Sequence, residues 1–172
     1  LSLEYQLWKK NSWAISASLL LGLPTGDDAG GSDGSYQTGD GEFNQSLQFN
    51  LGKSFPIGKQ HFYFKSSIAL NNRSRGYSDE WHFKLETGTK IAKEKLLVLG
   101  RLNTRQSLQN GRLSAINNNG SIFANNVEVT NLGGVIIYGF TKQFSVNVTA
   151  SFPLAGKVIY KAPALSAGIA LE

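Results

Sequence analysis

Few residues of this chain could perform acid–base or nucleophilic chemistry. Its 172 residues include two histidines, His61 and His82, and no cysteine. Neither histidine lies in a local Ser/His/Asp pattern such as G-x-S-x-G, and a chain without cysteine has no thiolate nucleophile or thiolate metal site. His61 lies beside a short turn, and His82 lies on the polar side of a predicted strand, where a hydrogen-bonding role is expected. We therefore predict no enzyme activity, no catalytic residue and no cofactor.

A second candidate for ligand chemistry is the acidic, glycine-rich loop from Pro24 to Glu42. Its carboxylates are the oxygen ligands that calcium prefers. Their spacing matches no EF-hand pattern, and acidic loops of this composition are more often solvated turns. The candidate ion site consists of Asp27, Asp28, Asp33 and Asp40, and no metal is assigned to it.

The elements that must position these side chains are predicted from a strict two-residue alternation, which is clearest after residue 80. Trp81 and Phe83 fall on one face, whereas His82 and Lys84 fall on the other. Side chains of a β-strand change face at every residue. A short polar turn follows, and the chain returns with the same alternation as far as Arg105, so this stretch is predicted to be a β-hairpin.

The same alternation extends over almost the whole chain and predicts one all-β domain over residues 1–172. No helix pattern and no second domain are visible. The connections between the predicted strands are alternately short and long, which is typical of outer-membrane barrels. The predicted strands cover residues 1–8, 13–23, 43–55, 62–71, 81–91, 96–105, 127–137, 144–152 and 165–171.

Alternation alone does not decide which face points toward water, but three other features favour a membrane. Charged residues make up only 17% of the chain, and the polar face is mostly Ser, Asn, Thr, Gln and Gly, unlike a solvated exterior. The connections alternate in length, and aromatic residues gather at both ends of the strands, as interfacial girdles do. We therefore predict an antiparallel up-and-down transmembrane β-barrel. A soluble lipocalin-type barrel, with its apolar face inside, is the alternative.

Three stretches of the sequence resemble a known family. They are LPTGD from Leu23 to Asp27, QTGDGEFNQ from Gln37 to Gln45, and NNRSRGYSDE from Asn71 to Glu80. They resemble a Bacteroidota-type outer-membrane β-barrel family, often described as transporter-like or phenol-degradation-pathway-like barrels. The resemblance covers nearly the whole chain, although only these stretches are specific. It implies a barrel in the bacterial outer membrane and does not define a substrate.

The lengths of the connections predict an orientation and a strand number. The long loops Pro24–Glu42 and Gln109–Ala124 are expected outside the cell, with Lys9–Asn11, Gly58 and Glu94 in the periplasm. The first strand then starts outside and the last ends in the periplasm. Single-chain barrels have even strand numbers and periplasmic termini, so we expect an odd number of further strands before this chain, and the family resemblance implies a signal peptide there as well.

The resemblance implies about twelve strands in total. The alternatives to missing N-terminal strands are an unusual odd-stranded barrel and a partner chain that supplies strands. All of these expectations concern the whole barrel, because the chain alone shows about nine strands.

Charged residues on the polar face predict the character of the lumen. We expect Glu86 to lie opposite Arg101 across the hairpin, with Lys65 diagonally near Glu86. The predicted lumen charge cluster also includes Lys84 and Arg105. Its excess of cations would select anions in a water-filled lumen, whereas an interior packed with ion pairs would not conduct.

The favoured interpretation is an outer-membrane barrel that forms a narrow pore, or a transport-associated barrel, for small solutes. The alternatives are a non-conducting structural barrel in an envelope complex and an outer-membrane lipid-modifying enzyme. The expected partners are outer-membrane lipids and other envelope proteins. Although the formal net charge is +5, the cations are scattered along strands and turns, so no nucleic-acid partner is predicted.

Overall fold

The structure is a computed structural model that describes residues 1–27, 32, 36, 38–93, 95–113, 125–159 and 161–171. Among these residues, no helix is long and apolar enough to cross a membrane. The ordered elements are strands throughout. They are β1 (Ser2–Lys10), β2 (Trp13–Gly22), β3 (Asn44–Ile57), β4 (Gln60–Arg73), β5 (Glu80–Ile91), β6 (Leu96–Ser107), β7 (Glu128–Gly139), β8 (Phe144–Lys157) and β9 (Ala164–Leu171).

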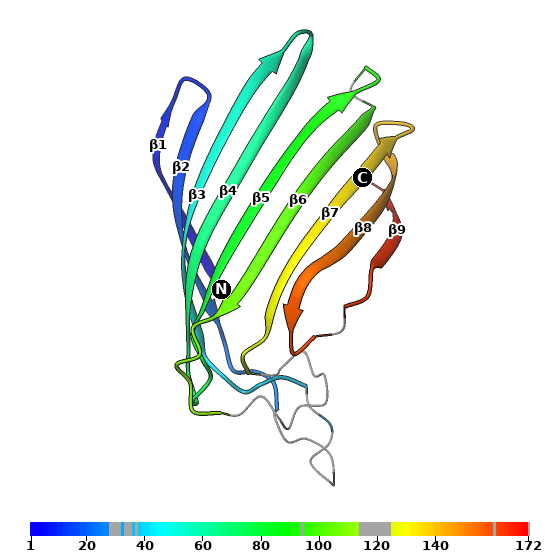
Figure 1. Ribbon diagram of the computed structural model, residues 1–172. Coiled ribbons are helices and arrows are strands. Elements are labelled where there is room, and N and C mark those ends of the chain that lie inside the picture. The colour runs from blue at the N-terminus through cyan, green and yellow to red at the C-terminus, as the bar shows by residue number, and fades with distance from the viewer. Residues whose placement is uncertain are drawn as a thin grey trace.

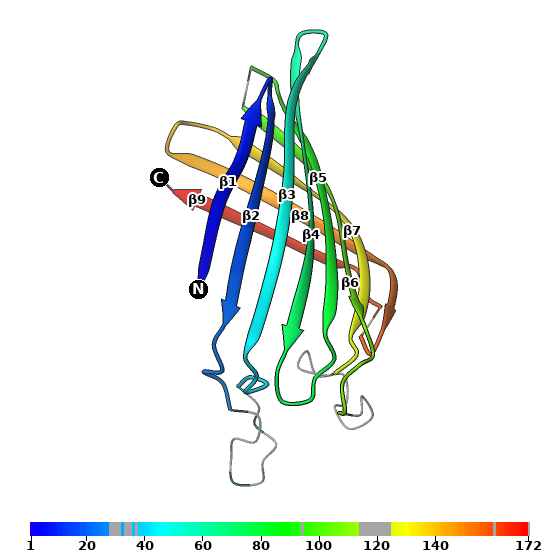
Figure 2. The same ribbon diagram turned by 90° about the vertical axis from the view of Figure 1, so that its left-hand side faces the viewer.

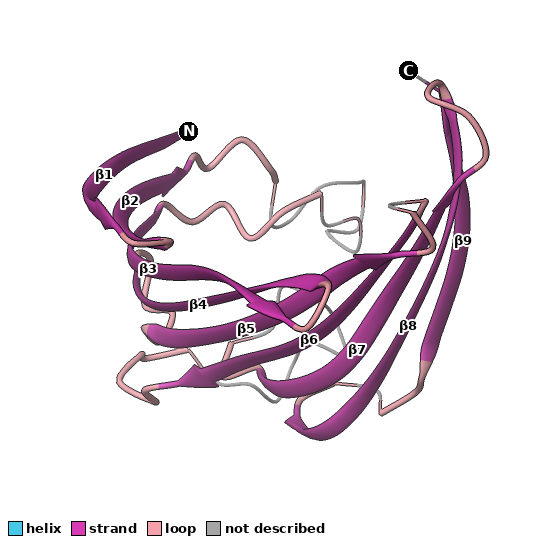
Figure 3. Ribbon diagram, turned by 90° about the horizontal axis from the view of Figure 1, so that it is seen from above, coloured by secondary structure: helices cyan, strands magenta, loops and turns pink. Residues whose placement is uncertain are grey.

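Each strand pairs in antiparallel fashion with the next strand along the chain. The nine strands therefore lie in sequence order in one sheet, with the short turns at one end and the long connections at the other (Figure 1). The predicted all-β, up-and-down arrangement is confirmed. The sheet is curved but not closed, since β1 and β9 form its two edges. Figure 3 shows these two strands on opposite rims of an open trough, and Figure 2 shows the same sheet from the side of β1.

Several strands extend beyond their predicted ends because their alternation continues into segments that were assigned to turns and loops. Pro56 belongs to β3, Arg73 ends β4 and Glu80 begins β5. The turn between β1 and β2 consists of Asn11 and Ser12, which have positive φ angles of 48° and 68°. Two consecutive positive φ angles are typical of the tight hairpin turn whose twist matches that of the strands.

The two faces of the sheet differ in chemistry. On the convex face, apolar side chains form rows across the strands, such as Phe49, Ile68 and Phe83 in β3, β4 and β5. Phe49 is 49% exposed and Ile68 is 54% exposed. The adjacent residues Asn50 and Ser67 point to the concave face and are buried. Most hydrophobic residues of β3–β5 therefore lie outside the curve and most polar residues lie inside it, whereas Leu99 and Val135 place apolar side chains on the concave face of β6 and β7.

The buried residues are mainly polar. Among the described residues only Ala69, Leu99, Val127 and Val135 are buried hydrophobic residues, whereas nine polar or charged residues are buried. A soluble up-and-down barrel buries its apolar face and exposes its charged face. In this open sheet, large hydrophobic side chains of the convex face are exposed, while most of the buried side chains are polar or charged.

Close packing on the concave face gives a test of the register. Gly88 of β5 lies between Tyr63 of β4 and Leu99 of β6, and an added Cβ would lie 2.8 Å from Tyr63 Cε1 and 2.5 Å from Leu99 Cδ2. We expect Gly88→Ala to lower the free energy of unfolding by about 1–3 kcal/mol, because both neighbours must move. The matched control is Gly100→Ala, whose added Cβ meets only Thr87 Cγ2 at 3.8 Å. Equal unfolding free energies for the two variants in urea titrations would contradict this packing.

Candidate functional site

Charged side chains of the concave face gather in two clusters. The antiparallel register brings them together from β4, β5 and β6 and from the connection before β3. We call the residues beside the long connections the loop-end cluster, and those further toward the short turns the mid-face cluster. The loop-end cluster consists of Asp40, Glu42, Arg73, Glu80, His82 and Arg105, and the mid-face cluster of Tyr63, Lys65, Glu86 and Arg101.

Arg73 is the centre of the loop-end cluster. Its Nε and Nη2 donate to Glu42 Oε1 at 2.7 and 2.6 Å, and its Nη1 donates to Glu80 Oε1 at 2.9 Å. Asp40 lies 3.6 Å from the guanidinium, which also lies over the Tyr77 ring at 4.5 Å from the ring centroid. The side chains of Arg73, Glu42 and Glu80 are only 5%, 2% and 4% exposed. This is a buried ion network, in which each charge depends on its partners.

Carboxylates outnumber arginines in the loop-end cluster, and Glu42 is the least well compensated. Glu80 Oε2 contacts His82 Nε2 at 2.9 Å and lies 3.8 Å from Arg105 Nε. By contrast, Glu42 Oε2 is buried with no hydrogen-bond partner among the described residues. Burial raises the pKa of Glu42, and Arg73 offsets only part of that increase. The cluster therefore favours the protonated form of Glu42 as the pH falls.

The mid-face cluster confirms the predicted pairing of Glu86 with Arg101. The two residues lie opposite each other across β5 and β6, and Arg101 Nε donates to Glu86 Oε2 at 2.6 Å. The Tyr63 hydroxyl donates to Glu86 Oε1 at 2.8 Å. Lys65 lies directly opposite Glu86 rather than diagonally near it, because the strands on either side of the β4–β5 connection are longer than predicted.

The remaining residues of the predicted lumen charge cluster occupy different positions. Lys84 lies one row from the mid-face cluster, between Ser67 and Asn103. Arg105 lies nearer the long connections, where it approaches Glu80. The single cluster predicted from the sequence is therefore divided in two along the axis of the sheet.

The candidate ion site is described only in part, because Asp28 and Asp33 lie outside the described residues. Glu94 and residues 114–124, which belong to the predicted turn and loop, also lie outside them. Asp40 contacts the guanidinium of Arg73. Asp27 uses its backbone carbonyl to accept a hydrogen bond from the Thr38 amide at 2.9 Å. Within the described part of the chain, no group of three His, Asp or Glu residues could hold a metal ion.

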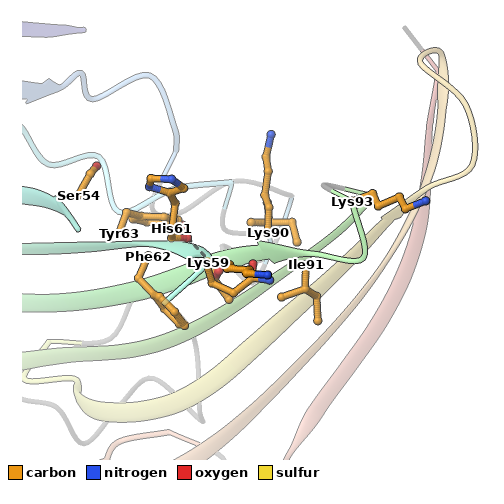
Figure 4. Close-up of a pocket in the computed structure, with 11 residues that line it drawn as sticks. Ser54, Lys59, His61, Phe62, Tyr63, Lys90, Ile91 and Lys93 are labelled. Carbon is orange, nitrogen blue, oxygen red and sulfur yellow. Dashed lines mark hydrogen bonds between the residues drawn. The ribbon is translucent and has the colours of Figure 1, made fainter. Parts of the chain in front are cut away.

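The two histidines lie at different ends of the concave face. His82 contacts Glu80, in agreement with the hydrogen-bonding role expected for it. His61 lines a hollow of about 580 Å³ beside the short turns. There, His61 and Lys90 point into the trough while Phe62 points to the opposite side (Figure 4). Among the hydrogen bonds of the described residues, none joins either imidazole ring to a serine hydroxyl.

A buried hydrogen-bond network joins the β4–β5 connection to the β6–β7 connection. The Ser78 amide donates to Asn125 Oδ1 at 2.9 Å, and Asn125 Nδ2 donates to the Leu113 carbonyl at 2.6 Å. The Gly111 amide donates to Ser78 Oγ at 2.9 Å. Ser78 and Asn125 are each only 1% exposed. These contacts hold two connections together beside the loop-end cluster.

Asp79 is the acceptor that links this network to Arg73. Its Oδ1 accepts from the Arg73 amide at 2.9 Å and from Asn72 Nδ2 at 3.0 Å, and its Oδ2 accepts from Asn110 Nδ2 at 2.8 Å. Burial alone would raise the pKa of Asp79, but these hydrogen bonds outweigh that effect and lower it. The connection is therefore built around an ionised carboxylate.

The loop-end cluster was not predicted as a site. Arg73 and Glu80 were expected in a polar connection, whereas both lie in strands. A signal was present, because Asn71 and Arg73 continue the polar parity of β4, and Glu80 continues that of His82. The contact between Ser78 and Asn125 has no such signal, since 47 residues separate them and neither lies in a strand.

The ion network predicts a strong dependence of stability on Arg73. We expect Arg73→Met to lower the free energy of unfolding by about 3–5 kcal/mol, because it leaves Glu42 and Glu80 buried without a guanidinium. The matched control is Arg105→Met, because that side chain is 45% exposed and lies 3.8 Å from Glu80. The free energy of unfolding of this control variant should fall by less than about 1 kcal/mol. Similar losses for the two variants in urea unfolding would refute the central role of Arg73.

The lowered pKa of Asp79 predicts a pH-dependent contribution. Its ionised form contributes stability above the ordinary pKa of an aspartate, and this contribution is lost as the pH falls through the lowered pKa of the folded state. At neutral pH, Asp79→Asn should lower the free energy of unfolding by about 1–3 kcal/mol. The difference from the wild-type protein should shrink on acidification. A difference that stayed constant from neutral to strongly acidic pH would argue against this assignment.

Comparison with known proteins identifies no relative of this chain. No family model, no curated protein and no solved structure matches it. The likeness of the three quoted stretches to an outer-membrane barrel family therefore remains an expectation from the sequence. What the site can do follows from its own charges, hollows and hydrogen bonds.

Proposed function

We propose that this chain belongs to a bacterial outer-membrane β-barrel protein whose concave face lines a narrow, water-filled pore for small solutes. The observation that carries the proposal is the distribution of side chains across the curved sheet. An exposed apolar face on the convex side suits lipid, and a polar concave side suits a hydrated lumen. In water, an apolar surface of this extent would be an aggregation hazard.

The convex face has the charge pattern that a bilayer requires. Between the row that contains Lys53 and the row that contains Gln106, the convex positions of β2–β6 carry no Lys, Arg, Asp or Glu. Lys53 itself lies near the short turns, with its amino group 4.4 Å from the Trp13 ring centroid. A lysine at that position can extend toward an interface while its stem stays among aromatic rings.

Aromatic contacts near the short turns support the same proposal. Phe55 and Phe62 stack with their ring centroids 6.1 Å apart. The ring centroid of Phe140 lies 4.8 Å from that of Tyr138 and 5.5 Å from that of Phe144. Aromatic residues at the ends of transmembrane strands form girdles at the two interfaces of the membrane.

In this proposal, the free edges of β1 and β9 pair with further strands, from the same protein or from a second chain. Backbone amides and carbonyls cannot remain unpaired in lipid, so a spanning sheet must close. The long connections face the outside and the short turns face the periplasm, as their lengths indicate. The loop-end cluster then lies at the external mouth of the pore.

Transport is favoured over a sealed barrel because hollows remain between the charged side chains. One hollow of about 300 Å³ lies beside the mid-face cluster, and another of about 580 Å³ lies at the short-turn end. The direct test is to reconstitute the full-length protein in planar bilayers after recovery from the outer-membrane fraction. Discrete conductance steps are expected. If the protein is recovered from the outer-membrane fraction but shows no conductance, the non-conducting structural barrel would be supported instead.

A charge scan of adjacent residues tests the lipid-facing side. Leu102 lies on the convex face of β6, and its neighbour Asn103 lies on the concave face. We expect Leu102→Lys to lower the free energy of unfolding in lipid vesicles by about 2–4 kcal/mol, since it places a charge in the hydrocarbon region. Asn103→Lys, the matched comparison, keeps its charge in the hydrated trough, so repulsion by Lys84 opposite it should lower the free energy of unfolding by about 1 kcal/mol or less. Equal tolerance of the two lysines would mean that the convex face is in water.

A further inference from the structure

We infer that the concave face holds a binding site for small oxyanions, in the hollow between β3 and β6 beside the mid-face cluster. Its role in transport rests on the proposed pore, but the site itself does not. The hollow has a volume of about 300 Å³ and is lined by three cationic side chains, those of Lys65, Lys84 and Arg101, against the single carboxylate of Glu86. We call it the oxyanion hollow.

Glu86, which also lies opposite Lys65, is already engaged by two donors, and one carboxylate does not balance the three cationic side chains of the oxyanion hollow. Glu86 accepts hydrogen bonds from Arg101 Nε at 2.6 Å and from the Tyr63 hydroxyl at 2.8 Å. Within the described part of the chain, neither Lys65 nor Lys84 forms a salt bridge, and both are exposed to the hollow. Among the described residues Arg101 bonds to Glu86 through Nε, which leaves its two terminal nitrogens able to donate to a solute. The hollow therefore carries an excess of positive charge.

Neutral donors complete the site. Ser67 and Asn103 lie on either side of Lys84 in the same row of the sheet. Their hydroxyl and amide groups can donate hydrogen bonds, and lysine ammonium groups donate without accepting. An oxyanion is acceptor-only when fully ionised, so this set of donors matches a carboxylate, phosphate or sulfate group rather than a cation or a neutral sugar. The volume suits a compact solute.

Further cations on the same face could pass an anion along the trough. On the polar side of β5 and β6, Lys90 lies nearer the short turns and Arg105 nearer the long connections. The oxyanion hollow lies between them. A conducting path needs sites that attract an ion yet release it, and exposed lysines in an open hollow bind weakly enough for release. The site thus specifies the solute class of the proposed pore as small anions.

Calorimetric titration tests binding without reference to conductance. The full-length protein in detergent is titrated at neutral pH with inorganic phosphate and, separately, with acetate. We expect saturable binding of at least one probe, which the Lys65→Gln/Lys84→Gln double variant weakens by about tenfold or more. Lys142→Gln, in the turn between β7 and β8, is the charge-matched control and should bind within about twofold of wild type. Binding of both probes supports a general oxyanion site, and binding of one narrows the class.

Absence of saturable binding to the wild-type protein overturns the inference, as does binding by the double variant within about twofold of wild type. The heat-dependent electrophoretic mobility of each variant shows that it is folded. Bilayer measurements then separate the site from the pore. A chloride preference that falls by about threefold or more in the double variant supports the inference. Saturable binding without conductance would support the oxyanion site and refute the proposed pore. Conductance without binding or anion preference would refute the oxyanion site and leave the proposed pore supported.

Discussion

The structure depends on the antiparallel ladder that keeps consecutive side chains on opposite faces of one curved sheet. Because the side-chain period is two, a slip of one residue would exchange the faces of a whole strand. A slip of β4 would turn Lys65 toward the convex side and Ile68 into the trough. The ion pairs inside and the apolar rows outside therefore fix the same register. Each face stabilises the arrangement of the other.

At the loop end, the register acts through Arg73, which joins the strands to their connections. Its guanidinium holds Glu42, before β3, and Glu80, at the start of β5, while its backbone amide donates to Asp79. Asp79 in turn accepts from Asn110, after β6. Arg73 of β4 thus contacts β5 directly and, together with Asp79, links the β2–β3, β4–β5 and β6–β7 connections. A buried charge network of this kind contributes less net stability than it costs when one of its members is removed.

The features that the sequence predicted are the local ones. The strands, their order and the pairing of Glu86 with Arg101 follow from periodicity and a short turn, which act over a few residues. Lys65 was placed less accurately, because its position relative to Glu86 depends on where strands end on either side of a polar connection. Propensity alone places Arg73 and Glu80 in such a connection, but the charges of the concave face retain them in the sheet.

Contacts between connections could not be predicted from the same signals. The Ser78 amide donates to Asn125 across two connections that leave the same end of the sheet, and 47 residues separate the two along the chain. Whether the sheet closes is likewise set by strands at its edges rather than by any pattern within a strand. Periodicity defines two faces, but curvature and side-chain size decide which face is hollowed and where the oxyanion hollow forms.

The proposed pore requires that the convex face contacts lipid while the concave face contacts water. Spin labels at consecutive positions 46–51 of β3, in protein reconstituted in vesicles, distinguish the two environments residue by residue. Collisions with dissolved oxygen, which enters lipid, should peak at Leu47, Phe49 and Leu51. Collisions with a water-soluble nickel chelate should peak at Ser46, Gln48 and Asn50. A profile without two-residue alternation, or one with the two peaks exchanged, would contradict the account.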